Sequence, residues 1–373
     1  MKLSQPPDIV LGDRAIGRDH PALIIAEIGT GHGGDLERGY QLIDSAAAAG
    51  ADCVKFQTVF AEEIIHPRTG DVELPGGPTP LYEVFQRLER NAEFYARLKA
   101  HTESVGLLFL SSPFGVRSAR LLRDIEVKAV KIASPEINHY PLLNEVATWG
   151  VPVIVSAGVS KLGDIEQSLA RLPGPTAILH CVTAYPAPES EYNLRCIPTL
   201  SAAFHRCVGV SDHSLDPIAV PTLAVAMGGM VVEKHFTLDK TGDGLDDPVA
   251  LTPAQFGEMV AAVRSVEDMD AADKLDSLIE RYGHEQVVGI LGDGQKKLAD
   301  SEQGNYHTTN RSIIAIRDIA VGETLSPDNI ALLRSEKNLS PGLTPEFLPV
   351  IVGHGAQRPI QSGHGIEWTD LFV

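Results

Sequence analysis

The chain has 373 residues, of which 43% are hydrophobic and 21% charged, so extensive disorder is excluded and two domains, or one large and one small domain, are expected. With 49 acidic against 31 basic residues, the formal net charge is −18, which argues against a sequence-independent grip on nucleic acid or an anionic membrane. The longest apolar stretch, residues 218–232, contains Pro221 and is shorter than the roughly 20 residues of a membrane-spanning helix.

The N-terminal residues and the cysteines predict a cytoplasmic protein. Residues 1–13 lack the basic start and the apolar run of a signal peptide. None of the four cysteines, Cys53, Cys181, Cys196 and Cys207, belongs to a CxxC pair, and the first two lie inside apolar runs, as buried thiols do. A reducing compartment is therefore expected.

From residue 22 to about 265, short β-branched runs alternate with longer amphipathic stretches. The runs are continuously apolar, which is typical of parallel strands buried on both faces. The predicted strands are 23–28, 53–57, 107–111, 129–134, 152–158, 177–182, 207–211 and 230–236. The predicted helices between them include 36–49, 92–104, 115–125, 161–172 and 215–228. Eight such units match the α/β fold of a TIM (β/α)8 barrel better than a doubly wound sheet.

The remainder of the chain changes in character. Residues 266–309 are polar and charged, which predicts a linker with some helix. From Arg311 short apolar runs return around turn signals, which predicts a small β-rich domain. We therefore expect a barrel domain over 1–270, a linker over 271–309 and a β-rich domain over 310–373.

Polar residues follow nearly every predicted strand, at the end of a TIM barrel where catalytic groups lie. Lys55 and Lys131 interrupt apolar strands, and a buried lysine is costly unless it is paired with an anion. Hydroxyl groups beside them would complete a cradle for phosphate or carboxylate. Each residue alone is more typical of a turn or the surface, but together they predict a local basic pocket. The other residues at these strand ends are Glu27, Gln57, Ser111, Ser112, Ser134, Glu136, Ser156, Thr183, Tyr185, Ser211, Asp212, Glu233 and Lys234.

Two histidines stand at neighbouring strand ends. His213 and His235 are about one βα unit apart, and two imidazoles there could bind a divalent metal while leaving positions for water and substrate. The alternative is a pair of hydrogen-bonded core histidines. His32 and His180 are weaker candidates, and His180 lies inside a predicted strand, where a structural role is more usual.

The run Gly29-Thr30-Gly31-His32-Gly33-Gly34 matches the dinucleotide-binding pattern GxGxxG between a strand and a helix. Two features argue against that interpretation. Glu27 would place a carboxylate close to the pyrophosphate, and the acid expected at the end of the second strand is replaced by Gln57. The glycines instead indicate a loop that passes close to a substrate.

Several longer motifs occur in a fixed order along the chain. They are IIAEIG followed by GHGGD (24–35), GADCVKFQT (50–58), FLSSPF (109–114), KIASPEINHYPLL (131–143), LHCVTAYPAP (179–188), VGVSDHS (208–214) and VEKHFTLDK (232–240). By these motifs the chain resembles the sialic acid synthase family, and it looks closest to the spore coat polysaccharide synthase type. The last 60 or so residues resemble the antifreeze-like (SAF) domain of that family.

The resemblance implies a transferase that condenses phosphoenolpyruvate with an aldose, typically an N-acylated aminosugar such as N-acetylmannosamine. The products would be a 2-keto-3-deoxy sugar acid of the nonulosonic type and phosphate. It also implies a divalent metal, Mn or Mg, held by His213 and His235 and assisting C–C bond formation. The natural destination of such a product is a surface polysaccharide or glycoconjugate.

The resemblance also implies roles for the other residues. Glu27 and Glu136 would be polar or proton-handling groups at the reacting atoms, and the histidines would join them in catalysis. Arg334 would reach the acyl group of the sugar in the barrel of a partner subunit, which implies a domain-swapped homodimer. The residues around phosphoenolpyruvate would be Lys55, Ser112, Lys131, Ser134, Ser156 and Ser211, and those facing the sugar would be Gln57, Tyr185 and Asp246.

Three departures from the family pattern lie where sugar contacts are expected. Family members often have Asn at the positions of Gly31 and Thr183, and the run after Asp246 is here 247–250, Asp-Pro-Val-Ala. The phosphate and metal positions are intact, so the condensation is better supported than any named sugar. Two alternatives remain: another metal-dependent TIM-barrel aldolase or lyase, which would not need the SAF-like tail, and a noncatalytic sugar-binding relative, which should have lost a lysine or a metal histidine.

Overall fold

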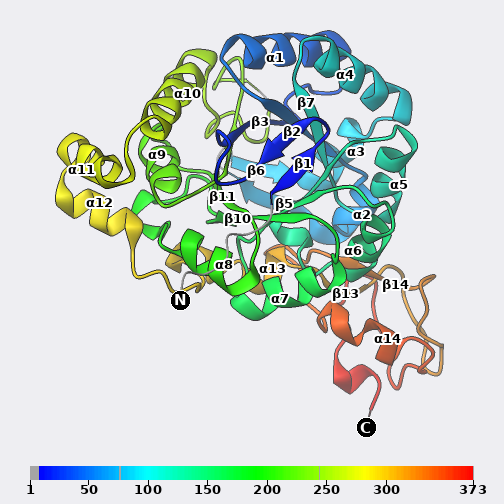
Figure 1. Cartoon of the computed structure of the whole chain (residues 1–373). Coiled ribbons are helices and arrows are strands. Elements are labelled where there is room, and N and C mark those ends of the chain that lie inside the picture. Colours follow the sequence, from blue (N-terminus) through cyan, green and yellow to red (C-terminus); the bar gives the residue numbers. More distant parts are fainter. Residues whose placement is uncertain (1–7, 75–76, 243, 373) are drawn as a thin grey trace.

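A computed structural model describes residues 8–74, 77–242 and 244–372. Eight parallel strands form a barrel at its centre, as the sequence predicts (Figure 1). The hydrogen-bonded order is β7-β4-β3-β12-β11-β10-β9-β8. Strand β8 packs beside β7, and this contact, which has no hydrogen-bonded ladder within the described ranges, completes the barrel. The strands are β3 (Leu23–Gly29), β4 (Cys53–Thr58), β7 (Leu108–Pro113), β8 (Val130–Ile132), β9 (Val153–Ser156), β10 (Thr176–Cys181), β11 (Val208–Asp212) and β12 (Val231–His235).

Helices surround the barrel, and the five predicted from the sequence are present. Most follow one strand and lead to the next, which is the right-handed βαβ arrangement of this fold. They are α1 (Leu36–Ala48), α4 (Ala92–Ser104), α5 (Val116–Asp124), α6 (Tyr140–Ala147), α7 (Leu162–Arg171), α8 (Cys196–Phe204), α9 (Ala219–Ala226) and α10 (Pro253–Glu267). An excursion between β4 and β7 adds α2 (Ala61–Ile64), β5 (Asp71–Leu74), β6 (Gly77–Pro80) and α3 (Leu81–Leu88).

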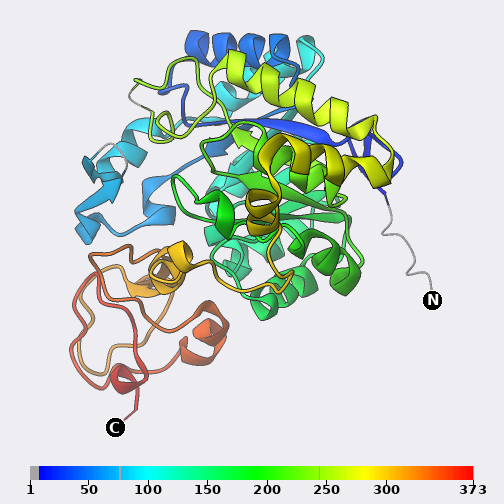
Figure 2. The same ribbon diagram turned by 90° about the vertical axis from the view of Figure 1, so that its left-hand side faces the viewer.

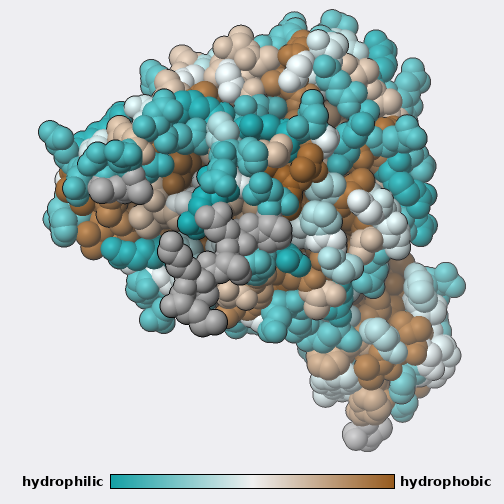
Figure 3. Space-filling model, viewed as in Figure 1, coloured by the Kyte–Doolittle hydropathy of each residue, from teal (hydrophilic) through white to brown (hydrophobic). Residues whose placement is uncertain are grey.

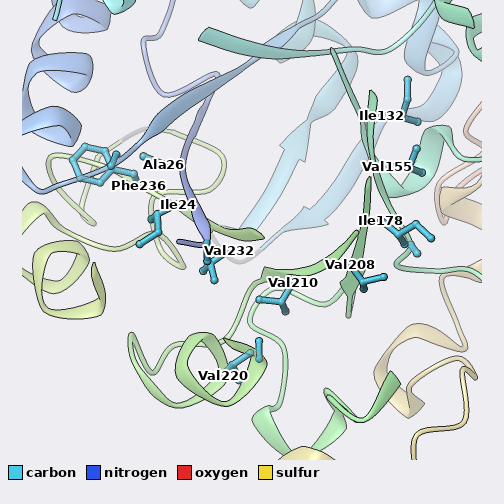
Figure 4. Close-up of a cluster of buried hydrophobic side chains, with 14 of the residues drawn as sticks. Ile24, Ala26, Ile132, Val155, Ile178, Val208, Val210, Val220, Val232 and Phe236 are labelled. Carbon is cyan, nitrogen blue, oxygen red and sulfur yellow. The ribbon is translucent and has the colours of Figure 1, made fainter. Parts of the chain in front are cut away.

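The strands place alternate residues on opposite faces, so each contributes to two cores. The residues that face the helices form the main core, part of which is seen in Figure 4 around Ile24, Val155 and Val232. The residues that face the barrel axis are apolar in its N-terminal half, where Ile25 and Leu179 are fully buried. A short hairpin of β1 (Ile9–Leu11) and β2 (Arg14–Ile16) closes that end, because its Ile9, Leu11 and Ile16 side chains join this inner core.

The predicted linker, residues 271–309, runs along the barrel rather than away from it. It contains α11 (Ala271–Tyr282) and α12 (His284–Leu291), whose buried Leu278, Val287 and Ile290 belong to the main core. A short 3-10 turn (Asp300–Glu302) and α13 (Tyr306–Thr309) then lead into the C-terminal domain.

The C-terminal domain has its own small core of Ile313, Ile319, Ile330, Ile351 and Ile366. Its regular elements are β13 (Ser312–Ala315), β14 (Ile330–Leu333) and α14 (Leu348–Ile351). Figure 2 shows this domain on the side of the barrel away from the N-terminal hairpin. The backbone of Arg334, just after β14, forms a β-bridge with Ile65 of the β4–β7 excursion, so the domain docks directly on the barrel.

The face of the molecule seen in Figure 3 is mostly hydrophilic, and smaller apolar areas lie between the polar ones. Within the described ranges, no helix combines the length and the hydropathy that crossing a bilayer requires.

Candidate active site

The C-terminal half of the barrel interior is polar, in contrast to the apolar N-terminal half. Along β3 the inward-facing side chain after Ile25 is Glu27, and along β9 the one after Ile154 is Ser156. Charged and hydroxyl groups therefore form one layer at the barrel mouth. Its members are Glu27, Lys55, Ser112, Lys131, Ser156, Ser211 and Glu233, all of them buried.

Glu233 lies at the centre of this layer, between the two predicted lysines. Its Oε1 is 3.4 Å from Lys55 Nζ and 3.4 Å from Lys131 Nζ, and it accepts a hydrogen bond of 3.2 Å from Ser211 Oγ. Lys131 also donates to Ser156 Oγ at 2.7 Å. The two ammonium groups are thus held about one carboxylate, as a buried charge requires.

Lys55 makes the second half of the network. Its Nζ is 2.9 Å from Glu27 Oε2 and donates to Ser112 Oγ at 3.4 Å. Gln57 Nε2 donates to the other oxygen, Glu27 Oε1, at 2.9 Å. Six of the residues predicted around phosphoenolpyruvate and the reacting atoms, together with Gln57 and Glu233, therefore lie in one continuous network.

The charges of this network shift its protonation equilibria. Burial would lower the pKa of Lys55, but the carboxylates of Glu233 and Glu27 outweigh it and raise that pKa. Burial lowers the pKa of Lys131, and Glu233 offsets this only in part. For Glu233, burial is opposed by Lys131 and Lys55, which hold the pKa of the carboxyl well below its usual value. The raised pKa of Lys55 keeps its ammonium group charged, and this group can turn from its carboxylate partners to an anionic ligand.

The glycine-rich turn closes one side of the mouth. Gly29 has φ +59°, and a Cβ there would come within 3.4 Å of Asp246 Oδ2 and 3.2 Å of Gln57 Nε2. A larger residue would therefore enter the space between the polar groups, which is the close approach that glycine permits. Asp246 is partly exposed and lies 3.7 Å from His235 Nδ1.

His213 and His235 lie side by side, with ring centroids 5.4 Å apart. His213 Nδ1 donates to the Val182 carbonyl at 2.9 Å, which fixes the tautomer and leaves the Nε2 lone pair free to accept. The Tyr185 ring stacks on His213 at 4.2 Å, and its Oη is 3.3 Å from Nε2. The predicted histidine pair and the predicted sugar-facing tyrosine thus form one cluster.

This donor set fits an open metal site rather than a closed one. Two imidazoles at 5.4 Å can share one divalent ion, and the Val182 carbonyl supplies the usual partner of the second ring nitrogen. In the part of the chain that the structure describes, no three His, Cys, Asp or Glu side chains converge on one point. The other coordination positions would therefore fall to water and substrate.

Glu136 and Arg334 form a separate group at the contact between barrel and C-terminal domain. Glu136 Oε1 accepts from Arg334 Nη2 at 2.7 Å, and Glu136 Oε2 accepts from Arg311 Nε at 2.7 Å. Burial would raise the pKa of Glu136, but the two guanidinium groups lower it. Ser134, two residues earlier, uses its Oγ to accept from the Gly158 N–H at 3.0 Å.

Two residues of these groups, Glu233 and Arg311, have no role predicted from the sequence. The sequence predicts Glu233 only at a strand end, but its place two residues before His235 puts both side chains on the same face of the strand. Lys234 faces outward, where its Nζ bonds to Asp212 Oδ2, so only Glu233 and His235 face the barrel axis. Arg311 carries no local signal, because its partners lie far away in the sequence.

The weaker candidates His32 and His180 are buried away from this cluster. His32 Nδ1 accepts from the Gly34 N–H at 2.8 Å, among the rings of Phe94 and Tyr95. His180 Nε2 donates to the Tyr192 carbonyl. Burial, reinforced by nearby arginines, lowers the pKa of His32 to about 4, and burial together with Lys296 lowers that of His180 to about 3.

These two histidines predict acid destabilisation. Their folded-state pKa lies below the ordinary 6.5, so their contribution is present above pH 6.5 and is lost as the pH falls toward 4. The free energy of unfolding in urea should fall by about 1.4 kcal/mol per pH unit for each histidine in that window. His180→Gln should remove one such contribution, whereas His307→Gln, at an exposed position, should not. An unchanged slope in His180→Gln contradicts the prediction.

A model of the NeuB family matches residues 42–274, and a model of the SAF domain matches residues 310–371. The spore coat polysaccharide biosynthesis protein SpsE of Bacillus subtilis is 36% identical over 97% of both chains, and its crystal structure superimposes with a TM-score of 0.83 over 98% of this chain and 99% of that one.

Two further relatives carry names of acid synthases. The N,N'-diacetyllegionaminic acid synthase of Campylobacter jejuni is 34% identical over 87% of this chain and 94% of its own length. The human N-acetylneuraminate-9-phosphate synthase is 30% identical over 91% of this chain and 90% of its own length.

Proposed function

The chain belongs to the NeuB family, and from this premise we propose that it condenses phosphoenolpyruvate with the aldehyde form of a sugar. The products would be a nonulosonic-type 2-keto-3-deoxy acid and phosphate. Relatives named as acid synthases support this reaction class. The observation that carries it is the pair of buried lysines about Glu233, at a barrel mouth that also holds two imidazoles. Cys53, Cys181 and Cys196 are buried thiols outside any disulfide, which supports a reducing, cytoplasmic setting.

Phosphoenolpyruvate carries a phosphate and a carboxylate, and the inner layer offers both a cation and hydroxyl groups to each. Lys131 with Ser156, and Lys55 with Ser112, are pairs that can turn from their present partners to an anionic ligand. Ser134 and Ser211 stand beside them and would complete the cradle. Fixed donors of this kind hold the enol ester in place and screen its charge while the bond forms.

The proposed reaction has two stages. The C3 carbon of phosphoenolpyruvate attacks the aldehyde carbon, which forms the C–C bond and leaves positive charge at C2. Water then adds at C2, and the C2–O bond to phosphate breaks, so that one water is consumed for each phosphate released. Glu27, bonded to Lys55 and Gln57 in the inner layer, is the carboxylate that we place to take the proton of that water.

The two arginines that contact Glu136 favour a structural role for this carboxylate rather than proton transfer. A carboxylate held at 2.7 Å by both Arg311 and Arg334, with a lowered pKa, is poorly suited to exchange a proton. We propose that it anchors Arg334 at the mouth, where the guanidinium would meet the acyl group of the sugar. Gln57, Tyr185 and Asp246 would line the rest of the sugar site.

His213 and His235 would hold the divalent metal, Mn or Mg, and His213 would do so through Nε2, which now contacts Tyr185 Oη. When bound, the ion would polarise the aldehyde oxygen as a Lewis acid. Tyr185, stacked on His213, would keep that ring oriented and exclude water from one face of it.

A domain-swapped homodimer is part of the same proposal. In this structure Arg334 contacts Glu136 of its own chain. In an exchanged dimer the partner's C-terminal domain would make the same contact, and each site would be built from two chains. A sedimentation mass of a single chain would rule out this assembly.

The test is phosphate release from phosphoenolpyruvate with Mn, across a panel of aldoses. The panel contains N-acetylmannosamine, mannose, diacetylated 6-deoxyhexoses and their 6-phosphates. Several sugars are needed because Gly31 and Thr183 depart from the family pattern where sugar contacts are expected, so the family does not identify the sugar. We expect one sugar to support turnover, EDTA to abolish it, and His213→Ala to lower it by about 10²-fold or more. His307→Ala, an exposed histidine, is the matched control.

The same assay separates the alternatives. Release that needs no sugar, or cleavage of a preformed sugar phosphate, would point to a different lyase or aldolase. No release with any sugar from folded, metal-loaded protein would contradict the proposed synthase. Binding of phosphoenolpyruvate without turnover would then identify a noncatalytic relative.

A further inference from the structure

Residues 299–311, called the strap here, cross the barrel mouth between α12 and the C-terminal domain. Tyr306 Oη donates to Asp164 at 2.9 Å, and Asn310 Nδ2 donates to the Val159 carbonyl at 2.9 Å. Arg311 and Asn138 exchange two hydrogen bonds, of 3.1 and 2.9 Å. The strap thus contacts the loops after three successive strands, β8, β9 and β10.

Glu302 is the most deeply placed carboxylate of the strap, with a side chain that is almost wholly buried. Its Oε1 accepts the backbone N–H of Val159 at 2.7 Å and that of Thr183 at 2.7 Å. Its Oε2 accepts the N–H of Ala299, in the strap itself, at 3.1 Å. One carboxylate oxygen therefore joins the loop after β9 to the loop after β10, and charge-assisted bonds of this length are among the stronger ones.

The two loops need such a tie because they meet under strain and at close range. Val159 has φ +39°, a region that a β-branched residue adopts only at a cost of about 1–3 kcal/mol. A Cβ on Gly158 would lie 2.0 Å from Thr183 Oγ1, so the two loops already touch. The shared acceptor on Glu302 satisfies both N–H groups and holds the loops in that arrangement.

The loop after β10 also carries the cluster at the histidines. Two residues beyond Thr183, Tyr185 stacks on His213 with 4.2 Å between ring centroids. The lysines, by contrast, are on the strands β4 and β8 and are held by Glu233. A shift of the loop should therefore move the sugar side of the site and leave the phosphate side in place.

We propose that Glu302 is a positioning residue that sets the sugar-facing loop after β10 by anchoring it to the loop after β9. The role rests on the proposed function, since it concerns the sugar half of that site. Glu302 itself is turned away from the reacting atoms, toward backbone N–H groups.

The test compares three variants. Glu302→Ala removes both acceptor oxygens and so all three hydrogen bonds, and we expect kcat/KM for the sugar that supports turnover to fall by about 10²-fold, with KM for phosphoenolpyruvate changed by less than about threefold. Glu302→Gln keeps an oxygen for both barrel N–H groups and should restore activity to within about fivefold. Asp300→Ala, which removes an exposed carboxylate of the same turn, should leave both constants unchanged.

Equal losses for both substrates, or a folded Glu302→Ala with nearly unchanged sugar kinetics, would overturn the proposal. If Glu302→Ala does not fold, Glu302→Asp tests the same contact with a carboxylate that is one methylene too short. In Glu302→Asp, kcat/KM for the sugar should again fall while KM for phosphoenolpyruvate changes little, but the fall should be smaller than in Glu302→Ala. Full activity of Glu302→Asp would overturn the assignment.

Hydrogen exchange gives a readout that does not depend on turnover. The amides of Val159 and Thr183 should be protected in the wild-type protein and exchange faster in Glu302→Asp, while amides of β4 stay protected. Fast exchange at both amides in the wild type would overturn the positioning role. If the exchange result holds but no sugar is turned over, the proposed function fails and the loop tie stands.

Discussion

Replacing Lys131 by methionine is expected to lower kcat/KM for phosphoenolpyruvate by about 10²–10³-fold, the usual effect of losing one preorganised charged donor. Methionine keeps the length of the side chain and removes the ammonium group that contacts Glu233 and Ser156. The remaining cation, Lys55, would then be neutralised by Glu233 and Glu27 together, so little positive charge would face the ligand. Initial rates of phosphate release at saturating sugar measure the effect.

The same substitution at Lys128, an exposed lysine three residues earlier, provides the control and should leave the rate unchanged. Ser156→Ala removes only the hydroxyl partner of Lys131 and should cost about tenfold. A Lys131→Met enzyme within tenfold of the wild type would show that the lysine does not bind the substrate anion.

Replacing Arg311 by methionine is expected to lower the free energy of unfolding by about 3–5 kcal/mol, because it breaks a buried ion pair and leaves its partner behind. Arg311 is fully buried and its guanidinium bonds to Glu136. It also donates to four backbone carbonyl oxygens, of Glu63, Ile64, Phe114 and Leu332. Urea denaturation of the full chain measures the loss.

Two controls define the cause of that loss. Arg317→Met, at a half-exposed arginine of the same domain, should change the unfolding free energy by less than about 1 kcal/mol. Arg311→Lys should fall between the two, since an ammonium group keeps the charge but cannot replace a planar fork of five donors. A loss below 1 kcal/mol in Arg311→Met would contradict the structural role.

The barrel could be predicted from sequence because its signal is local. Each strand is a short continuous apolar run, and the regular return of such runs leaves few folds to choose from. The lysines were recognisable for the same reason, since Lys55 and Lys131 interrupt those runs. The roles of individual residues came from the family resemblance, which local patterns alone could not supply.

What could not be predicted depends on contacts between distant parts of the chain. The hairpin of β1 and β2 is too short to recognise and is stable because the barrel offers it an inner core. Glu302 and Arg311 lie in or beside a polar segment that is predicted as a linker, and their partners in the barrel are more than 100 residues away. Glu233, by contrast, could have been predicted. It lies two residues before His235 on the same strand, so both side chains point to the same face.

The order of synthesis affects how the barrel is completed at the seam between β7 and β8. Within the described ranges no ladder pairs β7 with β8, yet Arg311 reaches both sides of that gap, through the Phe114 carbonyl after β7 and Glu136 after β8. All eight strands leave the ribosome before Arg311 does. The contacts of Arg311 with both sides of this seam can therefore form only after all eight strands have been synthesised, which makes them a late step in folding.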